Sequence, residues 1–199
     1  MRKRVGSERN FNVFLVLVVT ISFALFFLES FPMTGNITSG STTSNVSIST
    51  YYSTSLGTNL SEGINFGAVA ALPATNVNAT HNNDSSTYSL GTNYTIDVSA
   101  DSNSAVDFCI SANAGLTSPA LDVIGLGNET YYASNLTNST HPSLSNEISM
   151  TTGYVKAINS IGRGNSSYWR FWLDVPSAQA SGSYNNSVSF EGVQAGQGC

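Results

Sequence analysis

Residues 168–176 have the sequence Tyr-Trp-Arg-Phe-Trp-Leu-Asp-Val-Pro. Every second residue in this stretch is large and apolar, at Trp169, Phe171, Leu173 and Val175. This period of two, with aromatic and β-branched residues, is typical of a β-strand with one buried face. Pro176 cannot donate a backbone hydrogen bond and therefore ends the strand. A second alternating segment, 184–193, follows a Ser-Gly turn signal, so we predict a hairpin at the centre of a β-sandwich.

The same alternation recurs in the chain before this hairpin. Segments 93–100 and 105–112 are separated by the polar turn Asp-Ser-Asn-Ser, which predicts a second hairpin. Other expected strands cover residues 45–56, 63–69, 121–132 and 148–158, and 72–90 is expected to be a polar excursion. About eight short strands at such intervals, without sustained helical periodicity, indicate an all-β protein with an Ig-like or jelly-roll-like antiparallel β-sandwich.

The sandwich domain, residues 45–199, is preceded by a membrane-type leader. Residues 11–28 form an uncharged apolar run, which as a helix would span about 27 Å, close to the hydrocarbon thickness of a bilayer. Four basic residues precede the run and place residues 1–10 in the cytoplasm. We expect a single transmembrane helix with the C-terminal domain extracellular, joined by a flexible linker at 29–44. The alternative is a secreted protein released by cleavage of a signal helix, although the run is long for one and lacks a small-residue cleavage site.

Charge is scarce and acidic outside the leader. Charged residues make up 10% of the chain, against about 25% in an ordinary soluble domain. From residue 30 onward, three basic residues face ten acidic ones, for a net charge of −7. Nucleic acids and anionic lipids both require a basic patch, so neither is an expected partner of the domain. A surface with so little charge needs another source of solubility, which glycans would supply.

Asn-x-Ser/Thr sequons for N-glycosylation are abundant in this chain. Asn45, Asn93 and Asn185 fall on the solvent face of their expected strands, which favours modification. The alternative is that a chain rich in Asn, Ser and Thr produces sequons by chance. The eleven candidate sites are Asn36, Asn45, Asn59, Asn78, Asn83, Asn93, Asn128, Asn135, Asn138, Asn165 and Asn185.

The chain contains two cysteines, Cys109 and Cys199. An even number in an exported domain favours a disulfide, which would fix the Gly-rich tail to the sandwich. Such a long loop removes denatured-state entropy worth about 4–5 kcal/mol in the chain-entropy model. Cys109 is opposite in phase to Phe108, so we expect it to face outward or to lie on a sheet edge. The alternative is a free buried Cys109 and a reactive terminal thiol.

No residue pattern in the chain indicates catalysis. His81 and His141 lie in polar segments without thiols or carboxylates at zinc-ligand spacing. Asp97, Asp101 and Asp107, with Asn103, flank the second hairpin and are candidate calcium ligands, although their spacing matches no calcium loop. We therefore expect no enzyme activity, no metal, no cofactor and no small-molecule substrate.

One group of side chains on the central strand is a candidate interaction surface. Tyr168, Arg170 and Trp172 alternate with the core residues and are expected to point outward, where aromatic and arginine side chains suit a protein or sugar contact. Cover by a neighbouring loop is the alternative. Arg170 and Asp174 are expected either to pair across strands or to be solvated.

Several segments together resemble archaeal secreted Ig-like surface glycoproteins, and more distantly the TasA-type biofilm fibre subunits and archaeal bundling-pilus proteins. These segments are 54–67, DFCISAN at 107–113, YWRFWLDVP at 168–176, SGSYNNSVSF at 181–190 and the terminal cysteine. The resemblance covers about residues 45–199 and implies an exported, glycan-bearing, non-catalytic β-sandwich. In the fibre members an N-terminal strand completes the sandwich of the next subunit. The matching donor strand here would be 45–56, with Val46, Ile48, Tyr52 and Leu56 as its apolar residues.

Three functions follow from these observations. The first is a structural cell-surface glycoprotein, bound to the membrane through residues 11–28 and touching copies of itself or other surface proteins. The second is a released subunit of an extracellular filament or pilus, assembled by donor-strand exchange through 45–56. The third is a carbohydrate-binding module using Trp172.

Overall fold

The computed structural model describes residues 12–21, 43–85, 87 and 89–199. The chain divides into two units, residues 1–47 and 48–199. In the first unit, residues 12–21 are helical. Within the described ranges, no helix is both long and apolar enough to cross a membrane. The rest of the predicted apolar run, the basic segment before it and nearly all of the predicted linker lie outside the described residues.

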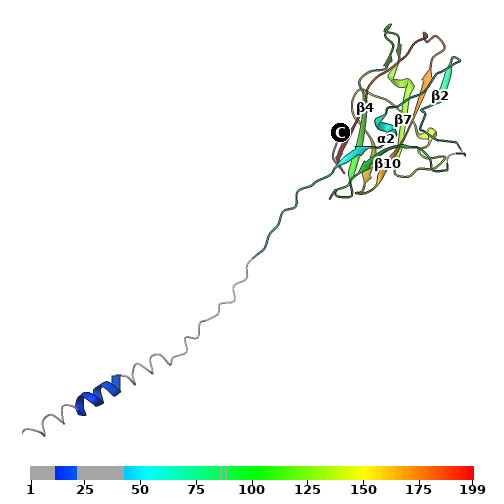
Figure 1. The fold of residues 1–199 in the computed structure, drawn as a ribbon. Coiled ribbons are helices and arrows are strands. Elements are labelled where there is room, and N and C mark those ends of the chain that lie inside the picture. Colours follow the sequence, from blue (N-terminus) through cyan, green and yellow to red (C-terminus); the bar gives the residue numbers. More distant parts are fainter. Residues whose placement is uncertain (1–11, 22–42, 86, 88) are drawn as a thin grey trace, which may run out of the picture. The chain divides into compact units, whose positions relative to one another are not determined.

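The second unit is built mainly from antiparallel strands. The largest of its sheets has β10 at the centre (Figure 1). The first half of β10 pairs with β3 and its second half with β2, while β7 runs along the other side. The six strands are β1 (Thr54–Leu56), β2 (Ala74–Asn78), β3 (Tyr94–Val98), β7 (Glu129–Ser134), β8 (Ile148–Ser149) and β10 (Ser166–Val175). The sheet order is β1-β3-β10-β7-β8.

The second sheet has three strands in the order β11-β4-β9, namely β11 (Val188–Gln194), β4 (Val106–Ala112) and β9 (Val155–Ile161). A separate two-stranded sheet pairs β5 (Leu116–Thr117) with β6 (Val123–Ile124). Among the residues of this unit that the structure describes, helical structure is limited to short turns: α2 (Thr58–Ser61) and the 3-10 helices η1 (Leu126–Asn128) and η2 (Leu144–Asn146). The predicted all-β, antiparallel class is therefore confirmed.

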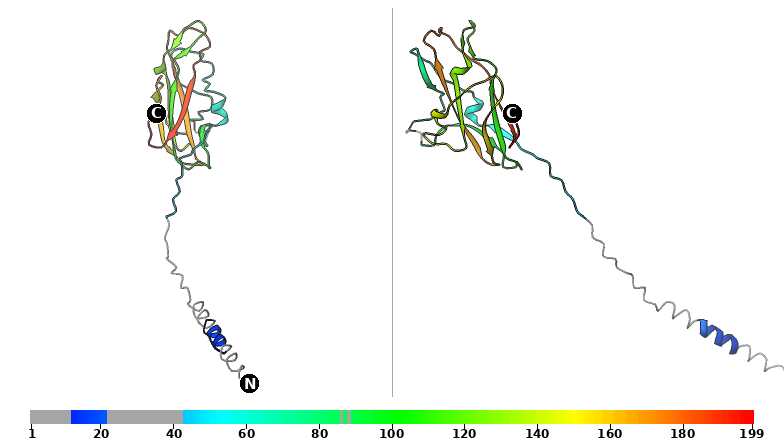
Figure 2. Two further views of the ribbon diagram at one scale, coloured as in Figure 1. Left: turned by 90° about the vertical axis from the view of Figure 1, so that its left-hand side faces the viewer. Right: turned by 180° about the vertical axis from the view of Figure 1, so that it is seen from behind.

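Aromatic side chains from the two larger sheets meet in a common core. Trp169 and Phe171 of β10 are fully buried and pack with Phe108 of β4. Phe190 of β11 packs edge-on against Trp169, with ring centroids 5.2 Å apart. The predicted inward face of the central strand is confirmed, and the two sheets lie as layers over this core (Figure 2).

The two predicted hairpins are wrong. β10 belongs to the six-stranded sheet, whereas β11, the predicted return strand, pairs with β4 in the other sheet. β3 and β4 are likewise separated between the sheets. A short polar turn and alternating flanks occur both in hairpins and in connections that cross from one layer to the other. Because each strand buries one apolar face in either case, the alternation does not tell which sheet a strand joins.

Strand boundaries in the first third of the domain also differ from the prediction. The predicted strand 45–56 is reduced to the three residues of β1, and Val46 and Ile48 before it are 84% and 81% exposed. The predicted strand 63–69 forms no strand, and the supposed polar excursion 72–90 contains β2. The predicted strand 148–158 separates into β8 and β9, which lie in different sheets.

Candidate functional site

The predicted interaction surface on β10 is buried. Tyr168 is partly exposed, but Arg170 and Trp172 are each only 1% exposed, so the expectation that they face solvent is wrong. A stacked sugar needs an accessible ring face, and the predicted sugar contact at Trp172 is therefore also wrong. The alternation placed both side chains on the correct face of the strand, but segments distant in sequence cover that face.

Arg170 ties these covering segments to the sheet through backbone carbonyls. Its Nε donates to the Asn82 carbonyl (2.7 Å), and Nη1 donates to that of Pro142 (2.7 Å). Its Nη2 donates to the carbonyls of Asn83 (3.0 Å) and Asn138 (2.7 Å). Burial lowers the pKa of the guanidinium, and the nearby charge of Asp84 opposes that shift. The predicted ion pairing of Arg170 across strands is wrong, because its partners are neutral acceptors from two loops.

The side chain of Asn82 fixes the first of these loops to β10 directly. Its Nδ2 donates to the Phe171 carbonyl (2.6 Å), and its Oδ1 accepts from the Phe171 N–H (2.9 Å). The amide thus pairs with the backbone of β10 as a neighbouring strand would. Asp174, further along β10, accepts a hydrogen bond from the Asn76 N–H (2.7 Å).

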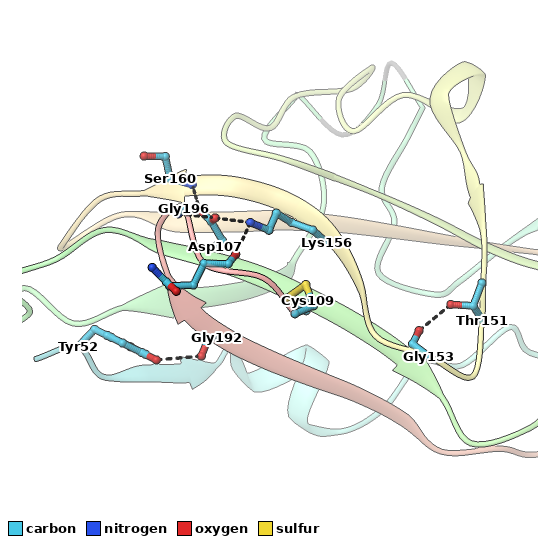
Figure 3. The surroundings of a disulfide bond; sticks show 11 residues. Tyr52, Asp107, Cys109, Thr151, Gly153, Lys156, Ser160, Gly192 and Gly196 are labelled. Atoms are coloured by element: carbon cyan, nitrogen blue, oxygen red, sulfur yellow. Dashed lines mark hydrogen bonds and ion pairs between the residues drawn. A yellow bond between two sulfur atoms is a disulfide. The ribbon is translucent and has the colours of Figure 1, made fainter. Parts of the chain in front are cut away.

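The predicted disulfide between Cys109 and Cys199 is confirmed, with Cα atoms 5.9 Å apart. Cys109 lies on the middle strand of its sheet, so the predicted edge position is wrong. Its side chain is on the face of β4 opposite to the core residue Phe108, as the outward-facing alternative expects, but it is fully buried. The chain segment that the disulfide holds covers this face of β4, as Figure 3 shows. Gly196 and Gln197 of that segment contact Asp107 and Lys156, respectively.

Asp107 is the polar centre of this face (Figure 3). Its carboxylate accepts hydrogen bonds from Lys156 Nζ (2.8 Å), the Ser160 N–H (2.7 Å) and the Gly196 N–H (2.9 Å). Burial alone would raise the pKa of Asp107, but these three donors and the lysine charge outweigh it and lower the pKa. Ser160 has a positive φ of 58°, close to where the β4–β9 register shifts, so Asp107 also stabilises an irregular backbone turn.

The candidate calcium ligands Asp97, Asp101 and Asp107 do not form a common binding site. Asp97 accepts a hydrogen bond from Ser166 Oγ (2.5 Å), while Asp107 has the partners described above. His141 Nδ1 lies 3.2 Å from Asn138 Oδ1 within its own loop. In residues 12–21 and the described part of 43–199, no three His, Cys, Asp or Glu side chains are grouped in a way that could hold a metal ion.

The sequon asparagines lie at the surface throughout the described part of the chain. Asn36 lies outside the described residues. None of the other ten is buried, and the predicted solvent-facing positions of Asn45, Asn93 and Asn185 are confirmed. The exposed ones are Asn45, Asn78, Asn93, Asn135, Asn165 and Asn185, and the partly exposed ones are Asn59, Asn83, Asn128 and Asn138.

One further feature, a cavity with a buried acid, is absent from the sequence-based expectations. The cavity has a volume of about 920 Å³ and is lined by Glu129 of β7, which is 1% exposed. Asn186 Nδ2 donates a hydrogen bond to its carboxylate (2.6 Å). Burial raises the pKa of Glu129, and the Asn186 contact offsets this shift in part. Glu129 is in phase with the inward-facing Tyr131 and Ala133, which is the one sequence signal that indicates its position.

Comparisons with protein-family models, with curated proteins and with solved structures find no match to this chain. The resemblance to archaeal surface glycoproteins and fibre subunits consequently remains a prediction from residues 45–199.

We expect Arg170→Met to destabilise the domain strongly. The substitution keeps an unbranched apolar stem but leaves four loop carbonyls without their donor, which should lower the free energy of unfolding by about 3 kcal/mol or more. Urea denaturation of the variant and of Arg163→Met, which changes an exposed arginine, measures the effect. A change at Arg170 as small as the roughly 0.5 kcal/mol expected at an exposed site would contradict the role of the carbonyl network.

We expect Asp107→Asn to destabilise the protein in a pH-dependent way. The folded-state pKa lies below the ordinary value of 3.8, so the charged carboxylate contributes stability above that value. This contribution is lost as the pH falls through the lowered pKa. The variant should lose about 1–3 kcal/mol at pH 7. Its stability should approach that of the wild type in unfolding measurements near pH 2, whereas exposed Asp101→Asn should show little effect at either pH. A deficit that stays constant over this range would refute the electrostatic assignment.

Proposed function

We propose that this protein is a structural cell-surface glycoprotein that displays its β-sandwich outside the membrane and has no catalytic role. The accessibility of the sequons is the observation that carries this proposal. Ten candidate asparagines occur in the described residues and none of them is buried. A domain with so few charged residues gains solubility from polar glycans on such positions.

The fold and the disulfide support the same assignment. The short connections from β3 to β4 and from β9 to β10 each pass between the two sheets, which favours an Ig-like or jelly-roll-like sandwich. A disulfide that closes a sequence separation of 90 residues suits an oxidising exterior. The apolar run at 11–28 with basic residues before it supports a retained membrane anchor.

Peptide mass spectrometry of the protein isolated from its native cells tests this proposal. We expect glycan-modified peptides at several of the ten accessible sequons, and we expect peptides from residues 11–28 in the membrane fraction. Asn103 and Asn113, which lie outside any sequon, provide an internal control. Unmodified asparagine at every sequon would refute the glycoprotein assignment, and a mature chain that begins after residue 28 would refute the anchor.

A filament subunit is the second candidate, favoured by an exposed apolar segment and a strand at the edge of a sheet. Val46 and Ile48 lie two residues apart outside any strand and are almost fully exposed. β11 is the edge strand of the three-stranded sheet. A groove of about 230 Å³ separates β1 from β11 and is floored by Ile96 and Phe108. An extended segment of a second copy would gain backbone pairing on β11 and apolar contacts in this groove.

Electron microscopy of the wild type and two variants tests the filament candidate. Val46→Asp combined with Ile48→Asp should abolish filaments, because each substitution puts a charge into the apolar groove. Ser47→Asp is the matched control, since it adds a charge to the same segment on the alternate face and should leave filaments intact. Wild-type protein that stays monomeric at high concentration, or filaments that survive the double substitution, would exclude the role of this segment.

A further inference from the structure

Two carboxylates are buried in this domain, and their environments differ sharply. Asp107 accepts hydrogen bonds from three donors, one of them the ammonium of Lys156. Glu129 is equally inaccessible, yet within the part of the chain that the structure describes one group, Asn186 Nδ2, donates to its carboxylate. An ionised carboxylate has about four acceptor positions. Asp107 is thus satisfied within the domain, whereas Glu129 retains unused acceptor capacity.

The unused capacity of Glu129 adjoins the large cavity. The cavity's volume of about 920 Å³ lies within the range of about 300–1,000 Å³ typical of ligand pockets. Its apolar walls include the cluster Leu116, Ile124, Leu173 and Val175, with Phe66 and Tyr184 packed against that cluster. The cavity therefore combines an apolar wall with polar groups, a combination that small-molecule sites use to bind a ligand and fix its orientation.

The charge of the lining selects the kind of molecule that would fit. Among the described residues around the cavity, Glu129 is the one carboxylate, and none is Lys, Arg or His. An anionic head group would therefore meet a carboxylate and no cation. A protonated amine would supply both an opposite charge and the hydrogen-bond donors that Glu129 lacks.

We propose that this cavity binds an apolar molecule that carries a single protonated amine, with its ammonium group hydrogen-bonded to the carboxylate of Glu129. The apolar part of the ligand lies against Leu116, Ile124, Leu173 and Val175, where it leaves water for a hydrophobic surface. Asn186 Nδ2 donates to the Oε2 atom of this carboxylate, so the ammonium of the ligand would bond to Oε1. This site goes beyond the structural role proposed above and differs from the expectation that the domain has no small-molecule ligand.

A chain segment of a second copy is the competing occupant. The groove beside β1 and the cavity share Leu56, Val188 and Phe190 in their linings, so a donated strand and a ligand could contact the same apolar side chains. The charge of Glu129 distinguishes a donated strand from an amine ligand. A strand with apolar residues such as Val46 and Ile48 brings no cation to Glu129, whereas an amine does.

Equilibrium dialysis of the full-length protein against three twelve-carbon probes tests the proposal. Dodecylamine, dodecanol and dodecanoate have the same chain and differ in the head group, and each is used below its micelle-forming concentration. We expect the wild type to bind dodecylamine at least tenfold more tightly than either of the other two. The preference should disappear in Glu129→Gln, which has nearly the same shape and no charge, and should persist in Glu191→Gln, which removes the same charge from an exposed position on β11.

Each outcome decides for or against the site. Equal binding of the three probes, or an amine preference that survives Glu129→Gln, would place the binding elsewhere on the chain and overturn the proposal. No measurable binding of dodecylamine by the wild type would also overturn it. Circular dichroism confirms that the variants are folded. Where Glu129→Gln fails to fold, equal binding of the three probes by the wild type still overturns the proposal. These results are independent of glycan occupancy and of filament formation.

Discussion

A guanidinium group buried on a β-sheet must find acceptors that the sheet itself does not offer, because the strand carbonyls are used in the ladder. Arg170 meets this constraint with four carbonyls from residues 82–83 and 138–142. Since the group is 1% exposed, every donor that lost such a partner would be left without water to replace it. The loops are therefore held down on β10, and the central strand is buried on both faces. The inward face is buried by aromatic packing and the outward face by directed hydrogen bonds.

The outer face of the three-stranded sheet is also covered by a distant chain segment, but other groups hold that segment in place. This outer face carries Asp107 and Cys109 on β4, and the chain segment that follows β11 covers both. Here a covalent bond fixes the segment, and the carboxylate orders it through the Gly196 N–H. Neither larger sheet thus leaves the outer face of its central strand open to solvent. The segments that cover β10 and β4 supply hydrogen-bond partners to polar side chains beneath them. Most buried polar side chains are therefore paired, although the domain has few charged residues.

The sequence predicted the features that follow from alternation along one strand or from the number of cysteines. Alternation identified the buried face of β10, and the cysteine count identified the disulfide, because both follow from local pattern or simple pairing. The sheet to which β11 belongs was missed, since a turn of a given length serves a hairpin and a layer crossing equally well. The burial of Arg170 was missed for a related reason: its acceptors lie 28 to 88 residues away in sequence. α2 is one turn long, too short to show a helical period.

The position of Glu129 was only partly predictable from the sequence. Its phase with Tyr131 and Ala133 was visible in the sequence, but the start of β7 was not, and an acid at a strand end is ordinarily solvated. In the fold, residues of the two-stranded sheet and the segment containing Tyr184 line a cavity together with this carboxylate. Natural domains seldom retain a buried acid with one donor next to apolar space, because an apolar residue or a protonated partner would be more stable there. Asp107, with three donors in the same domain, shows that this fold can satisfy a buried carboxylate completely. The incomplete hydrogen bonding of Glu129 is therefore better explained by a partner from outside the chain than by a structural role.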